Sequence, residues 1–76
     1  MRRLEWHPVA IHDLREIHWR AGARIDAAVM RFAETGEGTI ERSPTDPRRI
    51  RLRVRGAVAL IFVAPDAIHV ARIFGS

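Results

Sequence analysis

The segment between residues 48 and 64 constrains the fold more than any other part of the sequence. On one side of its first half lie Arg49, Arg51, Arg53 and Arg55, which alternate with Ile50, Leu52 and Val54. This period of two predicts a β-strand with one charged and one apolar face. Gly56 then marks a hairpin turn, and residues 57–64 are Ala-Val-Ala-Leu-Ile-Phe-Val-Ala, which is apolar on both faces. The segment therefore predicts a β-hairpin whose second strand needs apolar cover on both sides.

The first half of the chain has the periodicity of one short strand followed by two helices. Residues 2–6 alternate, and His7-Pro8 ends this run because proline lacks an N–H donor. Two apolar stripes at helical spacing follow: Ala10, Leu14, Ile17 and Ala21, then Ile25, Ala28, Val29 and Phe32. We expect Gly22 to break or bend the chain between the stripes. We expect Gly36 to end the second helix in a left-handed conformation.

The remaining segments complete an α+β pattern. Residues 39–42 offer a further short strand-like segment, residues 43–47 have the composition of a loop, and residues 67–74 predict a last strand. The order β-α-α-β-β-β predicts a mostly antiparallel sheet with a helical hairpin packed on one face. At 76 residues, the chain 1–76 is expected to form a single domain.

The predicted architecture leaves one face of the sheet to be covered. Two helices cover one side only, whereas residues 57–64 present Ala57, Ala59, Ile61 and Val63 to one face and Val58, Leu60, Phe62 and Ala64 to the other, so one apolar face lacks cover. Leaving that face in water forfeits several kcal/mol, and a domain of this size has a total stability of about 4–11 kcal/mol. Sheet curvature, a homodimer or a partner chain would each supply cover, and we favour a partner chain.

Composition excludes several classes of protein. The chain has no cysteine, which excludes a disulfide framework and the common structural zinc sites. No apolar run approaches the roughly 20 residues that span a bilayer, and residues 1–5 lack the apolar stretch of a signal peptide. No glycine-rich phosphate loop, dinucleotide fingerprint or Ser-His-Asp pattern is present. We expect a cytoplasmic protein with no membrane partner, no metal and no cofactor.

The basic charge is concentrated in the second half of the chain. All basic residues apart from the histidines are arginine, and the net charge is +4. Residues 1–46 hold seven arginines against eight acidic residues, whereas residues 47–76 hold six arginines against Asp66 alone. Five of these six lie within residues 48–55. Charge clustered in one element indicates a surface for a polyanion or an acidic protein, although a solvated strand face is the simpler interpretation.

One reaction that such a strand could serve is RNA cleavage by the 2′-hydroxyl group. This reaction needs a base, an acid for the leaving 5′-oxygen, and positive charge on the phosphate. Arg49, Arg51 and Arg53 could supply the charge, but arginine is a poor proton shuttle. The base would be a histidine or a carboxylate, and His69 on the last strand is the candidate. An ordinary surface or strand histidine is nevertheless the simpler interpretation of His69, and the same holds for the other histidines. The His12–Glu16 pair is better explained by stabilisation of a helix surface than by a metal site.

Four segments together resemble the RelE/ParE superfamily of toxins from bacterial type II toxin–antitoxin systems. They are Trp6-x-Pro8-x-Ala10-x-x-Asp13-Leu14-x-Glu16-Ile17, Arg31 to Gly38, Arg51-Leu52-Arg53-Val54, and Ile68 to Ile73 with its internal Arg72. They occur in the family's order and cover most of the chain.

This resemblance implies a toxin held inactive by a cognate antitoxin, in a homodimer or a heterotetramer with that antitoxin, and a link to plasmid stabilisation. In the RelE branch such toxins cut messenger RNA on the ribosome, and in the ParE branch they inhibit DNA gyrase. On the nuclease interpretation, Arg49, Arg51 and Arg53 are catalytic, Arg48, Arg55 and Arg72 bind RNA or another anion, and His69 is the possible acid or base.

The chain also departs from the family pattern. Family members usually carry a Gly-Asp-Tyr-Arg type turn after the arginine strand, and nuclease members tend to end in a basic segment with a late arginine and tyrosine. This chain contains no tyrosine and has Arg55-Gly56-Ala57 at the turn. These departures favour gyrase inhibition, or a form that binds antitoxin without toxicity. The arginine strand favours the messenger-RNA endoribonuclease.

Overall fold

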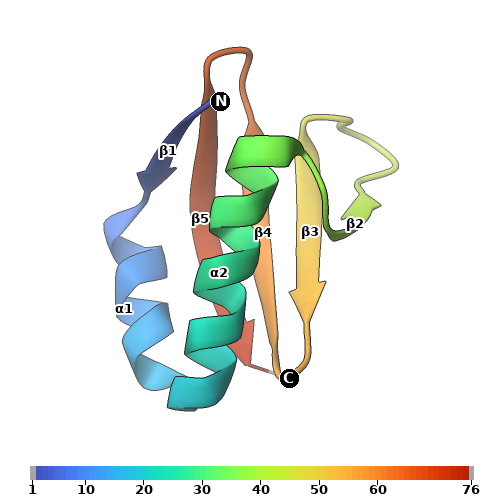
Figure 1. The fold of residues 1–76 in the computed structure, drawn as a ribbon. Coiled ribbons are helices and arrows are strands. Elements are labelled where there is room, and N and C mark those ends of the chain that lie inside the picture. Colours follow the sequence, from blue (N-terminus) through green and yellow to red (C-terminus); the bar gives the residue numbers. More distant parts are fainter. Residues whose placement is uncertain (1, 76) are drawn as a thin grey trace.

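The computed structural model describes residues 2–75, which form a five-stranded sheet with both helices on one of its faces (Figure 1). The elements are β1 (Arg3–Trp6), α1 (Pro8–Glu16), α2 (Trp19–Thr35), β2 (Thr39–Arg42), β3 (Arg49–Val54), β4 (Ala57–Val63) and β5 (Ala67–Gly75). Helix α1 lies against β5, and α2 lies across β3 and β4. The structure confirms the expected α+β class and the helical layer on one face.

The sheet has the strand order β1-β5-β4-β3-β2. Only β1 and β5 pair in parallel, with Arg3 opposite Ala67 and Trp6 opposite Val70. The other neighbours are antiparallel. The short segment at residues 39–42 does form a strand, β2, which pairs with β3 and gives the sheet its fifth member. The doubly apolar strand β4 is therefore central, with two strands on each side.

The hydrophobic core lies between the helices and the inner face of the sheet. Ile50 and Leu52 of β3 are 2% and 0% exposed, and Ile25 and Val29 of α2 are 0% exposed. The turn between β3 and β4 comes so close to α2 that a Cβ on Gly56 would lie 3.0 Å from the Ala21 side chain. Gly56 also has a φ of 90°, which favours glycine. The predicted hairpin turn is thus confirmed.

The break between the helices lies at Ile17 and His18, so the prediction of a break at Gly22 was wrong. Gly22 lies inside α2, where one glycine costs only about 1 kcal/mol relative to alanine. Each helix instead begins at a histidine: His7 Nδ1 accepts from the Val9 N–H and His18 Nδ1 from the Arg20 N–H, both at 3.2 Å. These caps satisfy N–H groups that helix starts leave unpaired.

The end of α2 follows the prediction. Gly36 has a φ of 75°, and its N–H donates to the Phe32 carbonyl at 2.8 Å. Within residues 2–75, neither helix has the length and apolar character needed to cross a membrane.

Candidate functional site

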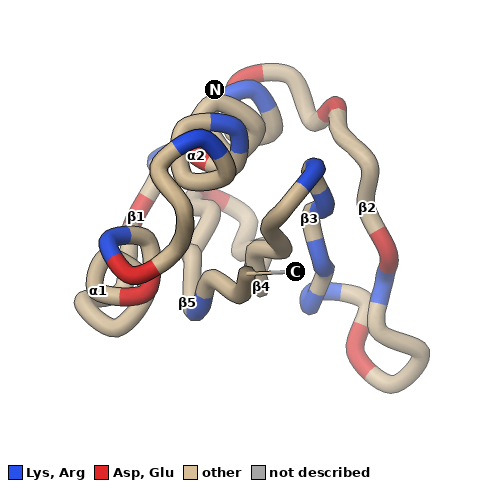
Figure 2. Tube along the Cα trace, turned by 90° about the horizontal axis from the view of Figure 1, so that it is seen from below, with Lys and Arg blue, Asp and Glu red and all other residues tan. Residues whose placement is uncertain are grey.

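The candidate site is the outer face of the sheet, which neither α1 nor α2 covers. Arg49, Arg51 and Arg53, hereafter the arginine row, are exposed on this face of β3, while Ile50 and Leu52 point into the core. Figure 2 shows the basic positions following one another along β3. On β4 the outward residues Val58, Leu60 and Phe62 are half-buried. The alternation predicted the charged side of β3, and the structure adds that the apolar side chains of β4 share this face.

The three members of the arginine row have different partners. Arg53 Nη2 lies 2.6 Å from Glu41 Oε1 on the edge strand β2. Arg49 Nε lies 3.8 Å from Asp46 Oδ2 in the preceding loop. Arg51 is directly opposite Glu41 in the strand register, yet it has no ion pair with any described residue. One guanidinium of the row is thus open to a ligand.

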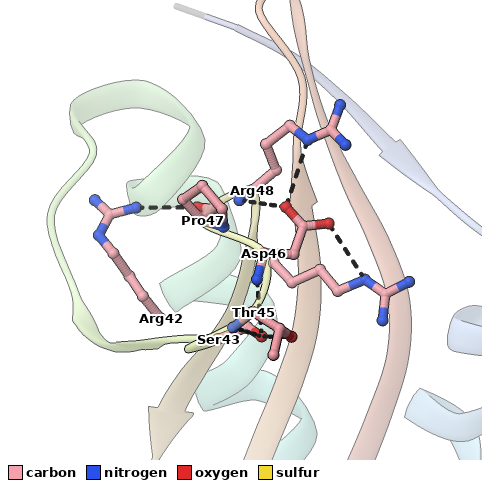
Figure 3. A network of polar contacts seen from close by, with 7 residues as sticks. Arg42, Ser43, Thr45, Asp46, Pro47 and Arg48 are labelled. Carbon is pink, nitrogen blue, oxygen red and sulfur yellow. Dashed lines mark hydrogen bonds and ion pairs between the residues drawn. The ribbon is translucent and has the colours of Figure 1, made fainter.

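The loop before β3 is ordered by its own polar groups (Figure 3). Asp46 Oδ1 accepts from the Arg48 N–H at 3.0 Å, and Ser43 Oγ accepts from the N–H groups of Thr45 and Asp46. The hydrogen bond from the Arg48 backbone is the main cause that lowers the pKa of Asp46. The loop therefore fixes a carboxylate beside the first residues of β3.

A shallow pocket lies where this loop meets β2 and β3. Its volume is about 370 Å³, and its lining is Glu41, Arg42, Ser43, Pro44, Arg49, Ile50, Arg51 and Leu60. Arg49 and Arg51 contribute charge, Ser43 a hydroxyl group and Leu60 an apolar surface. The lining of this pocket is therefore mostly polar and charged.

The predicted acid–base residue lies on the same face, two strands from the arginine row. Arg49, Phe62 and His69 are consecutive cross-strand neighbours on β3, β4 and β5. Two strand spacings place His69 about 10 Å from the row. Its Nδ1 atom lies 3.2 Å from Glu5 Oε2 on β1. The pair lines a second pocket, of about 560 Å³, at this side of the sheet.

Arg48 and His69 both lie near the Phe62 side chain. Its guanidinium carbon lies 5.1 Å from the centroid of the Phe62 ring, and the His69 ring centroid lies 6.4 Å from that same ring. The sequence placed Arg48 among the anion-binding candidates, and the structure brings it to the middle of the outer face. Phe62, which links the two side chains, was not singled out as a site residue.

Arg72 lies in a different environment. Its Nε and Nη2 atoms donate to the two oxygens of Asp13 at 2.8 and 3.2 Å, and Asp13 Oδ2 also accepts from the Ile73 N–H at 3.1 Å. The Arg72 side chain, followed by the Ile73 N–H, lowers the pKa of Asp13. Arg72 is therefore bound within the protein, and an anion-binding role for it requires this pair to open.

The Asp13 contact follows from the sheet topology. Strand β1 pairs with β5 only as far as Val70. Beyond this point Ala71 has no partner in the β4 register, and Arg72 lies opposite Leu60. This bulge keeps Ile73 buried, at 2% exposed, and α1 supplies the acceptor for its N–H through Asp13. Asp13 is separated from Arg72 by 59 positions along the chain and from Ile73 by 60, and no local sequence pattern signals this contact.

The remaining predicted residues have simpler settings. Arg55 lies in the β3–β4 turn, where its carbonyl accepts from Arg24 Nη1 at 3.2 Å. His12 Nε2 is 3.8 Å from Glu16 Oε1 on the exposed surface of α1. Across the described part of the chain, no three histidine, cysteine or acidic side chains are grouped to hold a metal ion.

Comparison with known proteins identifies the fold. No protein-family model matches the chain, and no curated protein matches it by sequence. Among solved structures, a chain of the RelB–RelE antitoxin–toxin complex from Methanococcus jannaschii has a TM-score of 0.78 at 17% identity, over 93% of this chain and 88% of that one. The chromosomal ParDE system from P. aeruginosa gives 0.73 at 20% identity, over 99% of this chain and 96% of the other.

A third structure extends the agreement. The RelBE2 toxin–antitoxin complex from Mycobacterium tuberculosis gives a TM-score of 0.65 at 18% identity, over 99% of this chain and 98% of that one. The chain therefore has the RelE/ParE toxin fold, as the resemblance in its sequence implied. At these identities the match defines the fold.

Proposed function

We propose that this protein is the toxin of a type II toxin–antitoxin system and inhibits translation as a ribosome-dependent messenger-RNA endoribonuclease. The arginine row on an open sheet face, within a RelE/ParE fold, is the observation that carries this proposal. The planar guanidinium group of arginine matches the geometry of phosphate oxygens. The guanidinium groups of the row are suited to hold a phosphodiester and to stabilise the extra negative charge of its transition state.

The proposed cleavage uses the RNA itself as nucleophile. The 2′-oxygen attacks phosphorus and loses its proton to a base, while the 5′-oxygen leaves and gains a proton, so that a cyclic phosphate and a free 5′-hydroxyl result. His69 is the proposed base or acid, because Glu5 can orient its ring through the 3.2 Å contact. Arg48 is proposed to act together with His69, since both side chains lie near the Phe62 ring.

A cognate antitoxin is the proposed partner for the half-buried outer face. Val58, Leu60 and Phe62 lie between charged strands, and Phe74 at the end of β5 is 44% exposed. Exposed apolar surface of this kind marks an interaction site. Two of the similar structures are antitoxin–toxin complexes, which supports this partner over a homodimer.

Inhibition of DNA gyrase without catalysis is the second candidate. The chain contains no tyrosine, and the fold matches a ParDE system as well as RelB–RelE complexes. On this interpretation the arginine row would bind an acidic surface of the target.

Induced expression in bacterial cells separates these functions. The nuclease is expected to stop incorporation of labelled amino acids within minutes and to produce cleaved messages in primer-extension assays. Induction of the DNA-damage response while translation continues would identify a gyrase inhibitor. Normal growth, with antitoxin binding retained, would show a form without toxicity.

A further inference from the structure

The members of the arginine row differ in how much charge they can offer to a ligand. Arg53 is paired with Glu41 at 2.6 Å, and Arg49 faces Asp46 at 3.8 Å. Arg51 lies between them without an acidic partner among residues 2–75. Because all three point to the same side of β3, the acidic residues of the chain itself already neutralise part of the row.

Glu41 is the residue that decides how many arginines are free. It lies on the edge strand β2, directly opposite Arg51, and lines the 370 Å³ pocket together with Arg49 and Arg51. Its side chain is 56% exposed and that of Arg53 is 51% exposed. Ion pairs this exposed contribute only about 0–1 kcal/mol to stability, so replacing Glu41 should leave the fold intact. While Glu41 is present, its carboxylate also repels a phosphate that approaches Arg51.

Asp46 is held more firmly than Glu41. Its side chain is 27% exposed and accepts from the Arg48 N–H, and its N–H in turn donates to Ser43 Oγ. The Asp46 carboxylate is thus built into the loop, whereas the Glu41 carboxylate is paired with Arg53 alone among the ion pairs of the described residues.

We infer that Arg51 makes the primary phosphate contact of the outer face, and that Glu41 is an internal counter-ion that withholds Arg53 from the RNA. This rests on the proposed nuclease function and names the ligand as the phosphodiester backbone of single-stranded RNA. Successive outward positions on a strand are about 6.8 Å apart, so the row follows an extended backbone. Leu60 and Phe62 beside it offer apolar surface for bases, which an acidic peptide would not use.

The test measures binding of a short fluorescent single-stranded RNA to the full chain by anisotropy over a range of salt concentrations. Glu41→Gln is expected to raise affinity about three- to tenfold and to steepen the slope of log K against log salt by about 0.7, the value of one added phosphate contact. Arg51→Ala is expected to weaken binding about tenfold or more. Adding Arg53→Ala to the Glu41→Gln protein should remove both the gain in RNA affinity and the increase in the salt slope.

Glu37→Gln is the matched control. Glu37 pairs with Arg31 at 2.6 Å, with side chains 63% and 67% exposed, so this change alters the same charge in a similar ion pair. It is expected to change RNA affinity less than twofold, because Arg31 is on α2 and the sheet separates it from the outer face. Equal effects of Glu41→Gln and Glu37→Gln would show that the change in net charge alone raises the affinity for RNA. That result would overturn the inference.

The experiment also distinguishes failure of the inference from failure of the proposed function. If cells show cleaved messages but Glu41→Gln leaves the affinity and the slope unchanged, the role of Glu41 is wrong and the nuclease stands. If the wild-type chain does not bind RNA at low salt, the inference fails, and the assay for cleaved messages in cells alone decides the nuclease, because the proposed activity depends on the ribosome. Glu41→Gln could instead raise the affinity for a polyglutamate peptide and leave the affinity for RNA unchanged. That result would indicate that the face binds an acidic protein, and it would overturn the inference.

Discussion

Arg72 on β5 and Arg51 on β3 are outward residues of two strands in the same sheet, yet their surroundings differ. Arg72 makes two hydrogen bonds to Asp13, a carboxylate that is only 16% exposed and also accepts from a backbone N–H. Arg51 lies beside a shallow pocket and has no acidic partner among the described residues. The first arginine holds α1 against the free edge of β5, and the second is available to a ligand. Both residues are arginines at outward positions of a strand. The comparison therefore teaches that the presence of an acidic partner, rather than the residue type or its place in the alternation, decides what each arginine does.

Removing the arginine row should have the largest functional effect. Arg49→Ala, Arg51→Ala and Arg53→Ala together are expected to abolish growth inhibition on induced expression, because the phosphate contacts are lost while the core side of β3 is intact. Growth curves and protein-synthesis assays measure the effect, and circular dichroism checks the fold. Retained toxicity in a folded triple variant would contradict an anion-binding role.

A change on the inner side of the same strand should instead destabilise the protein. Leu52 is 0% exposed, so Leu52→Ala is expected to lower the free energy of unfolding by about 2–5 kcal/mol. Urea denaturation measures this value. The triple arginine variant is the control, and if it loses as much stability as Leu52→Ala, the two faces of β3 do not have separate roles.

Replacing Asp13 tests the structural half of the comparison. Asp13→Ala is expected to lower the Tm by several degrees, because it leaves Arg72 unpaired and the Ile73 N–H without its acceptor. RNA binding should change less than it does in Arg51→Ala. A Tm equal to that of the wild type would show that the Asp13 contact does not hold α1 in place.

The same contact predicts a smaller effect of pH. The hydrogen bond from Arg72 is the main cause that lowers the pKa of Asp13 in the folded state. Its stabilising contribution is therefore fully present above the unfolded-state pKa, near 4, and is lost as the pH falls through the lower folded-state value. Thermal unfolding between pH 7 and pH 2 should show a shallower loss of stability in Asp13→Asn than in the wild type, with Asp46 responsible for part of what remains. Parallel curves for the two proteins would contradict the assignment.

Much of the outer face could be predicted because its signals are local. Alternation along residues 49–54 separates the arginine row from the buried side chains, and Gly36 and Gly56 end their elements as expected. The break at Gly22 was predicted wrongly because the His18 side chain, rather than a weak helix former, sets the start of α2. The capping role of His7 had a signal in the adjacent Pro8, which is favoured in the first turn of a helix.

The sequence by itself determined which side of each strand is charged and which is apolar, since side-chain direction along a strand follows from covalent geometry. Only the tertiary structure decided which arginines are neutralised. Glu41 meets Arg53 through the pairing of two strands, and Asp13 meets Arg72 through the packing of α1 beside a bulged edge. Such contacts depend on how distant segments are brought together, and the spacing of residues along the chain carries no record of them.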